Sequence, residues 1–315
     1  ITDCIISNIN GTSPKAGIDV EPNAGEIITN VLIQNVKVSD SYIGIMAYAR
    51  AQGAIINSVS FVDCYVDNVE FAGYRLIGEG IKHGVINSCV SVNSGGYPIE
   101  IRYVDNFVID SCKLITEATD VTGIFEASTN SGIITNCNIV ASEGIGVGSY
   151  VNISNNTIKS TTSVLNQHSF SSVTYITFDG NTCYGPLLLN SSNIKIINNI
   201  FKDNISGTCS NSIIDNNEIN RLNGTYINSI ISNNKINGSC FLVIDKCKID
   251  NNIIEANTLV SNLLCQLSGP TNQEGYNTIS NNTFRYNGDT EGNTLLSIYL
   301  KNSQINNNIL FNNII

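Results

Sequence analysis

The 315-residue sequence has no tryptophan, one methionine, five prolines and two histidines, and only 13% of its residues are charged. It has no run of 18 apolar residues, which excludes an ordinary membrane-spanning helix. Sixteen basic residues against 26 acidic ones give a net charge of −10, and the bases are not clustered. Since phosphate groups are bound by clustered Lys and Arg, we expect neither a nucleic-acid nor a membrane partner.

Apolar and amide residues dominate instead. Hydrophobic residues make up 42% of the chain, and asparagine accounts for roughly one residue in seven, far above average usage. Isoleucine recurs in almost every segment, so enough apolar surface is present to offset the conformational entropy lost on folding. Because the chain begins at Ile1 rather than Met, we expect a processed chain or a piece of a longer one.

One short motif recurs along the chain. It reads ISNNKING (231–238), IDNNEIN (214–220), IDNNIIE (249–255), ISNNTFR (279–285) and INNNILF (305–311). The wider frame, apolar-x-x-[Asn or Cys]-x-x, places anchors at Cys4, Asn35, Cys64, Cys89, Cys112, Cys137, Asn156, Asn181, Asn199, Asn217, Asn234, Asn252, Asn282 and Asn308. Their mean spacing of about 23 residues is typical of a solenoid.

Between anchors, short Ile/Val-rich runs of period two alternate with turns of Asn, Ser, Gly and Asp, a pattern that predicts strands rather than helices. A coil of short strands cannot bury its apolar side chains alone, so the coils must stack. The irregular spacing favours a right-handed coil with variable loops. We therefore predict an all-β fold, a right-handed parallel β-helix of about 13 to 14 coils with an Asn/Cys turn ladder, as a single domain over residues 1–315.

The anchors are expected to be structural. Asn tolerates a left-handed backbone at a sharp bend, and its amide can bond to the equivalent amide one coil away. Cys64, Cys89, Cys112 and Cys137 take the same position in successive coils. Parallel Cβ vectors do not suit a disulfide, and four ligands in a line cannot form a tetrahedral metal site. We expect buried, reduced thiols, no metal and no cofactor.

The INN-type turns, which cover nearly the whole chain, and the segment GIDVEPN (17–23) resemble the pectate-lyase-like right-handed β-helix superfamily, above all its bacteriophage tailspike and polysaccharide depolymerase branches. The resemblance implies a polysaccharide ligand on one lateral face, an extracellular or virion-surface location, and a homotrimer. Neither the NTD, GHG and RIK set of polygalacturonases nor the R-x-P-x-x-R of pectate lyases is present, so the resemblance does not extend to pectin.

Two strands carry candidate chemistry. In GIDVEPN, the period of two turns Asp19 and Glu21 to one outer face, where paired carboxyls could act as glycosidase acid and base. Alternatively, these acids are solvated surface groups or bind a cation. In YPIEIRY (97–103), Glu100 and Arg102 point outward between two tyrosines. Glu100 is a candidate catalytic acid or base and Arg102 a group that orients the substrate. Alternatively, the two form a surface ion pair.

We expect the ligand face between residues 17 and 126. The catalytic candidates are Asp19, Glu21 and Glu100, with Asp19 and Glu100 three coils apart. Candidate substrate-binding residues are Tyr48, Tyr74, Arg75, His83, Arg102, Tyr103 and Glu126. His83 is a candidate base, although a lone His beside a glycine is commonly a turn residue.

Three functions fit these features. The first is binding and cleavage of a bacterial surface polysaccharide, by a hydrolase rather than a lyase, because the acidic first half offers few bases to neutralise a uronate. The second is a non-catalytic carbohydrate- or receptor-binding rod, and the third is a structural shaft.

Overall fold

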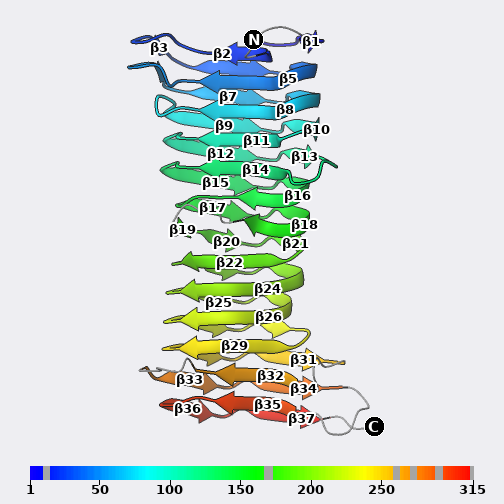
Figure 1. Cartoon of the computed structure of the whole chain (residues 1–315), viewed down its shortest axis with the longest axis vertical. Coiled ribbons are helices and arrows are strands. Elements are labelled where there is room, and N and C mark those ends of the chain that lie inside the picture. The colour runs from blue at the N-terminus through cyan, green and yellow to red at the C-terminus, as the bar shows by residue number, and fades with distance from the viewer. Residues whose placement is uncertain (10–14, 167–172, 258–262, 270–274, 288–293, 313–315) are drawn as a thin grey trace. The chain divides into compact units, whose positions relative to one another are not determined.

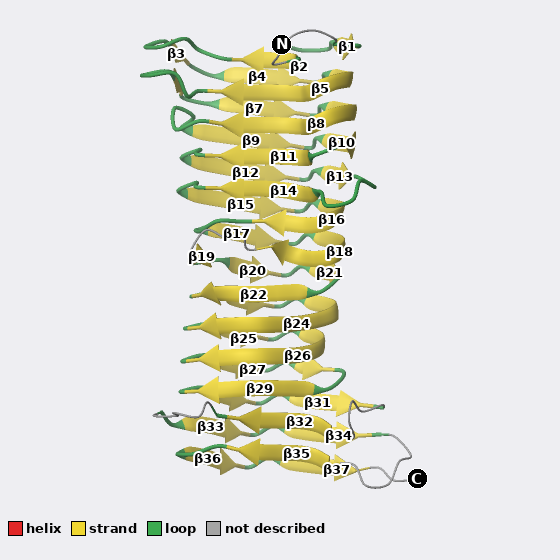
Figure 2. Cartoon of the chain, viewed as in Figure 1, coloured by secondary structure: helices red, strands yellow, loops and turns green. Residues whose placement is uncertain are grey.

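The computed structural model describes residues 1–9, 15–166, 173–257, 263–269, 275–287 and 294–312. These residues form two compact units, Ile1–Phe170 and Ser171–Ile315. Where the chain is described, every regular element is a strand, and within each unit the strands run as stacked parallel rungs (Figure 1; Figure 2). No helix in the described ranges is long and apolar enough to cross a membrane.

The first unit has three lateral faces. The first face consists of β4 (Val31–Gln34), β7 (Val59–Val62), β9 (His83–Asn87), β12 (Asn106–Asp110), β15 (Ser131–Thr135) and β17 (Val151–Ser154). The second consists of β1 (Ile5–Ser7), β10 (Val90–Ser94), β13 (Lys113–Ile115) and the opening halves of four long strands, β5 (Lys37–Tyr48), β8 (Tyr65–Ile77), β16 (Asn138–Gly146) and β18 (Thr157–Asn166). The third consists of β2 (Ala16–Val20), β11 (Tyr97–Arg102), β14 (Thr122–Ala127) and the closing halves of the long strands. We call this third face the ligand face, after the prediction that it binds a ligand.

A small extra sheet, β3 (Ile27–Ile28) with β6 (Ile55–Ile56), extends the early coils of this unit.

The second unit repeats the plan. One face contains β20 (Thr177–Asp179), β23 (Lys195–Ile197), β25 (Ile213–Asp215), β27 (Ile230–Ser232), β30 (Lys248–Asp250), β33 (Asn277–Ser280) and β36 (Ser303–Asn306). The other strands are β19 (Val173–Thr174), β21 (Thr182–Tyr184), β22 (Leu187–Ser192), β24 (Ile200–Ser210), β26 (Glu218–Ile227), β28 (Lys235–Ile236), β29 (Cys240–Asp245), β31 (Ile253–Ala256), β32 (Leu263–Ser268), β34 (Thr283–Tyr286), β35 (Thr294–Tyr299) and β37 (Ile309–Asn312).

In the recurring turn, one residue adopts the positive φ and the residue after it is buried. In ISNNKING, Asn233 adopts a positive φ of 55° and is exposed, while Asn234 is 1% exposed. A single Asn was expected to do both. The same division explains a correction at Asn35: this residue has a φ of 52°, and the buried anchor position belongs to Val36, whose carbonyl oxygen accepts from the Tyr65 N–H at 2.9 Å.

Buried asparagines bond from coil to coil in the second unit. The side-chain amide of each member donates to the side-chain oxygen of the next at 2.9–3.0 Å, through Asn181, Asn199, Asn217, Asn234, Asn252, Asn282 and Asn308. The same oxygen also accepts the backbone N–H of the preceding member, as Asn234 Oδ1 does from Asn217 N at 3.0 Å. A side chain with both a donor and an acceptor therefore satisfies buried backbone groups that water cannot reach.

Cysteines take this position in the first unit. The thiols of Cys64, Cys89 and Cys112 lie 3.4–3.5 Å from carbonyl oxygens of the preceding coil. All ten cysteines are unpaired, and nine of them are buried, Cys4 being the partly exposed exception. Hydrogen bonding within the row lowers the pKa of Cys64 to about 7, yet its 1% exposure keeps this thiol from reagents. The thiols thus act as small apolar residues with one weak donor.

Replacing Asn234 by Leu should lower the free energy of unfolding by about 1–3 kcal/mol, because the Ile214 carbonyl and the Asn217 N–H would lose their buried partner. Urea unfolding followed by circular dichroism measures the change. Asn237→Leu, at an exposed position, is the matched control and should leave the midpoint almost unchanged. Equal midpoints for the two variants would contradict the structural role of the buried amide.

Thiol titration should count one accessible cysteine in the native protein and ten after denaturation without reductant. The reason is that only Cys4 is partly exposed and none of the ten forms a disulfide. Mass spectrometry after alkylation identifies which cysteines react. A mapped disulfide among Cys64, Cys89, Cys112 and Cys137 would refute the reduced row.

Candidate functional site

The ligand face presents one outward row of side chains, one from each successive strand. Backbone register pairs Asp19 with Met46, Met46 with Arg75, Arg75 with Glu100, and Glu100 with Phe125. Asp19 and Glu100 are therefore three coils apart, as predicted, or about 14 Å at the usual strand spacing of ~4.8 Å. They cannot act on the same glycosidic bond.

Glu100 lies between two arginines at the centre of this row. Arg75 Nε donates to Glu100 Oε2 at 2.5 Å, and Arg102 Nε lies 2.6 Å from Oε1 without the alignment of a hydrogen bond. Glu100 is 1% exposed, whereas the side chains of Arg75 and Arg102 are 19% and 35% exposed. Glu100 does face outward, but the arginines cover it, so it is not open to act as a catalytic acid or base.

Aromatic rings flank the row where the strands of the ligand face begin. Tyr42, Phe71, Tyr97 and Phe125 form a continuous series with centroid separations of 5.5, 5.7 and 4.9 Å. The guanidinium carbon of Arg75 lies 5.1 Å from the Phe71 ring centre, and that of Arg102 lies 4.6 Å from the Phe125 ring centre. Cation–π contact and ion pairing together fix both guanidinium groups in place.

Asp19 and Glu21 interact at the first coil of this face. Partial burial, followed by repulsion from the nearby Glu21 carboxylate, raises the pKa of Asp19 above its usual value. Both residues keep solvent access. A carboxyl of raised pKa beside a second carboxyl is the arrangement that acid–base cleavage uses.

Two predicted binding residues are not on the surface, and both expectations are wrong. Tyr74 shares the inward register position of Ile45 and Ile99, is fully buried, and donates its hydroxyl to backbone oxygens of Cys64 and Val90. Because strand side chains alternate, the neighbouring Arg75 is the outward residue. Tyr74 therefore cannot stack on a sugar.

Glu126 pairs with the core residue Ile101 and is 1% exposed. Its carboxylate accepts from Thr129 N and Oγ1 at 3.2 and 2.7 Å and from Gly148 N at 2.6 Å. Burial raises the pKa of Glu126, and these hydrogen bonds oppose the shift. Glu126 therefore holds two turns together instead of contacting a ligand.

The remaining predicted residues lie on two different faces of the first unit. Tyr48 is half-buried at the end of β5, in register with Ile77 and, one coil further, with Arg102. Tyr103 follows β11 with a φ of 60° and is 36% exposed. His83 begins β9 on the first face, where it pairs with Asn106, so it does not join the ligand face.

The fold of this chain is similar to known proteins. A family model described as "Right handed beta helix region" matches residues 54–201, just under half of the chain. Together with the stacked parallel strands, it decides the architecture. The protein is a right-handed parallel β-helix. The predicted fold class and handedness are confirmed.

Solved structures similar to this β-helix include the A-module of mannuronan C-5 epimerase AlgE6 from Azotobacter vinelandii. It shares 12% identity and a TM-score of 0.52, over 93% of this chain and 88% of that one. The Dettilon tailspike protein shares 12% identity and a TM-score of 0.36, over 95% of this chain and 60% of its own. At these identities the likeness concerns the fold alone. No curated protein matches the sequence.

Sequence reasoning missed two parts of the site. Met46, Phe71 and Phe125 give no polar signal, and only the register between coils brings Met46 beside Arg75 and Phe125 beside Glu100. The turns 49–55 and 78–82, which line a hollow beyond the strand ends, lack a recognisable motif. Within the described ranges, no group of three or more His, Cys, Asp or Glu side chains is placed to hold a metal ion.

Replacing Glu100 by Gln should lower the free energy of unfolding by about 1–3 kcal/mol, because two partly covered guanidinium groups would lose their shared carboxylate. Chemical unfolding measures the change. Glu70→Gln, which alters an exposed carboxylate on β8, is the control and should have little effect. A Glu100→Gln variant as stable as Glu70→Gln would contradict the stabilising role of the Glu100 carboxylate between the two arginines.

Proposed function

We propose that the ligand face of the first unit binds a polysaccharide and that Asp19 and Glu21 cleave it by hydrolysis. The observation that carries the proposal is the outward row from Asp19 to Phe125 together with the aromatic series beside it, which places charged groups and rings on one face. Rings offer flat apolar surface to a sugar, and fixed charges orient its hydroxyl groups.

Rigidity supports a binding role. Arg75 and Arg102 are each held by Glu100 and by an aromatic ring, while part of each side chain remains exposed. Side chains that are ordered before the ligand arrives lose little entropy on binding. Successive coils repeat at ~4.8 Å, so a chain molecule lying along the face meets a new side chain at each coil.

The raised pKa of Asp19 supports its role as the acid. In the proposed reaction, protonated Asp19 gives its proton to the glycosidic oxygen as the bond to the anomeric carbon breaks. Glu21 acts either as the nucleophile or as the base that takes a proton from the attacking water, and the anomeric configuration of the product distinguishes the two. Glu100 was the third catalytic candidate, and its enclosure by two arginines favours a positioning role for it.

The natural ligand in this proposal is a bacterial surface polysaccharide, met at an extracellular or virion surface by a homotrimer. The second candidate function is a carbohydrate-binding rod without catalysis. The ordered Arg75, Glu100 and Arg102 cluster favours it, since this cluster can bind a sugar without any acid–base pair. Light scattering measures the oligomeric state separately.

The direct test is release of reducing ends from a panel of purified bacterial capsule polysaccharides and O-antigens. On a substrate that the parent cleaves, Asp19→Asn should lower turnover at least about 100-fold, the usual contribution of a general acid, and leave binding intact. Turnover by the parent should fall as the pH rises through the raised pKa of Asp19, because the acid must be protonated.

Glu100→Gln separates the two roles. It should weaken binding of the polysaccharide while keeping the pH dependence of turnover, because the Asp19 and Glu21 pair is three coils away. Full turnover by Asp19→Asn would overturn the catalytic assignment. A parent protein that binds a polysaccharide but cleaves none would establish the non-catalytic rod instead.

A further inference from the structure

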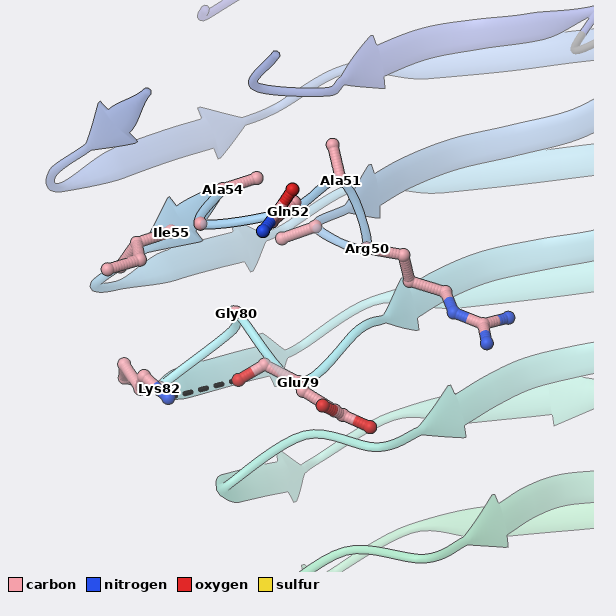
Figure 3. A pocket seen from close by; sticks show the side chains of 10 residues that line it. Arg50, Ala51, Gln52, Ala54, Ile55, Glu79, Gly80 and Lys82 are labelled. Atoms are coloured by element: carbon pink, nitrogen blue, oxygen red, sulfur yellow. Dashed lines mark hydrogen bonds between the residues drawn. The ribbon is translucent and has the colours of Figure 1, made fainter. Parts of the chain in front are cut away.

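A hollow of about 370 Å³ lies beyond the ends of β5 and β8 on the first unit. Two successive turns line it, with Arg50, Gln52, Glu79 and Lys82 as its polar side chains and Ala51, Ala54 and Gly80 as small ones (Figure 3). Its volume is at the lower end of the range for small-ligand sites. None of the predicted site residues lies in it.

Stacked turns build the walls. Three consecutive coils each close a tight turn at this corner, with backbone bonds of 2.9–3.0 Å from Glu26 N to Asn23 O, Ala54 N to Ala51 O and Ile81 N to Gly78 O. Gly53 packs over Gly25, and a Cβ at Gly80 would lie 2.1 Å from the Ala54 carbonyl oxygen. The turns therefore sit too closely to move independently, and the hollow is a built feature of the coils.

The next coil, which contains Arg102 and Tyr103, has no such turn, so the stack of turns ends at residues 78–82. After Arg102 the chain passes through Tyr103 to β12 directly. Arg50 reaches past Gly78 toward this lower coil, and its guanidinium carbon lies 5.2 Å from the Tyr103 ring centre. Gly78 has a φ of 133°, and a Cβ there would lie 2.2 Å from the Ala49 carbonyl oxygen, so this gap in the side-chain row is kept open. Arg50 lines the hollow, and the exposed Tyr103 ring lies beside its guanidinium, just outside the lining residues.

The charges around the hollow balance. Lys82 Nζ bonds to Asp105 Oδ2 at 2.9 Å and to the Glu79 carbonyl oxygen at 3.0 Å, which neutralises it (Figure 3). Among the described residues, Arg50 has no carboxylate within ion-pair distance, and the Glu79 side chain supplies one opposite charge on the same rim. Gln52 adds an amide that both donates and accepts. Donors and acceptors without net charge suit hydroxyl groups better than an anion or a cation.

We propose that this hollow binds one neutral hexose ring, carried as a branch on the polysaccharide that the ligand face holds. The inference rests on the proposed function, since Tyr48 on that face directly precedes Ala49, which lines the hollow, and Arg102 directly precedes Tyr103, whose ring lies beside Arg50. The branch ring stacks against Tyr103 and bonds through its hydroxyls to Arg50, Gln52 and Glu79. The backbone of the glycan stays on the outward row, and its branch points determine which polymers fit.

Ligand-observed saturation-transfer NMR tests the hollow with three probes, the methyl α-glycosides of D-glucose, D-galactose and D-mannose, and with methyl glucuronide as the charged comparison. At least one neutral glycoside should bind, and the glucuronide should bind at least about tenfold more weakly. Ala51→Phe places a ring in the hollow from its exposed rim and should abolish binding. Gln52→Ala, a smaller change, should weaken it about tenfold.

Thr119→Phe is the matched control, because it adds the same ring at an exposed turn outside the hollow, and it should bind as the parent does. Binding of no neutral glycoside by the parent, or unchanged binding by both Ala51→Phe and Gln52→Ala, overturns the inference. If the parent retains a polysaccharide while no glycoside binds, the hollow fails and the proposed function stands. If a glycoside binds in the hollow but no polysaccharide is retained, the proposed function fails instead.

Discussion

Parallel backbone hydrogen bonds between successive coils determine where each side chain of this protein lies. Because each coil bonds residue by residue to the coils on either side, side chains at equivalent positions form rows with a spacing of ~4.8 Å. The buried asparagines use this spacing to satisfy backbone groups at one corner of the second unit. The same constraint brings Arg75 to Glu100 on the ligand face, although 25 residues separate them along the chain.

Conformational freedom at the corner makes the stacking possible. Nearly every turn of this type has a residue of positive φ directly before the buried anchor, filled by Asn, Asp or Ser, for example Asp63, Ser88, Asn136 and Asn233. The second residue is buried and differs between the units: it is mostly Cys in the first unit, with Val36 and Asn156 as exceptions, and Asn in the second. The backbone conformation of the turn determines which residue types can fill the positive-φ position. The hydrogen bonds that the neighbouring coil needs determine the residue type at the buried anchor.

The repeat predicts the fold because each coil follows the same local rules, with period-two strands between Asn-rich turns. It also places Asp19 and Glu100 three coils apart, since counting anchors counts coils. The sequence does not show which side of a strand faces inward next to a bend. Tyr74 is the clearest case: strand β8 bends near Val69 and Ala72, the alternation shifts, and the tyrosine enters the core while Arg75 faces out. Glu126 is also buried, in register with Ile101, although no register shift occurs between its strand and β11.

The burial of the Glu100 side chain could not be predicted either, because it depends on side chains from neighbouring coils. Arg75 and Phe125 reach it only through register, and together with Arg102 they reduce its exposure to 1%. The sequence therefore shows that Glu100 and Arg102 are charged neighbours on one strand, but not that the carboxylate is covered. The hollow at turns 49–55 and 78–82 is a further consequence of stacking, since the turns of two successive coils line it.

The central claim is that the ligand face of the first unit holds the glycan, and hydroxyl-radical footprinting tests it most directly. Oxidation of each tyrosine is measured by mass spectrometry with and without a polysaccharide that the protein retains. The account predicts protection of Tyr42, Tyr48, Tyr97 and Tyr103, with exposed tyrosines of the second unit such as Tyr184 and Tyr299 unchanged. Protection confined to Tyr184 and Tyr299, with the four tyrosines of the first unit oxidised as before, would contradict it.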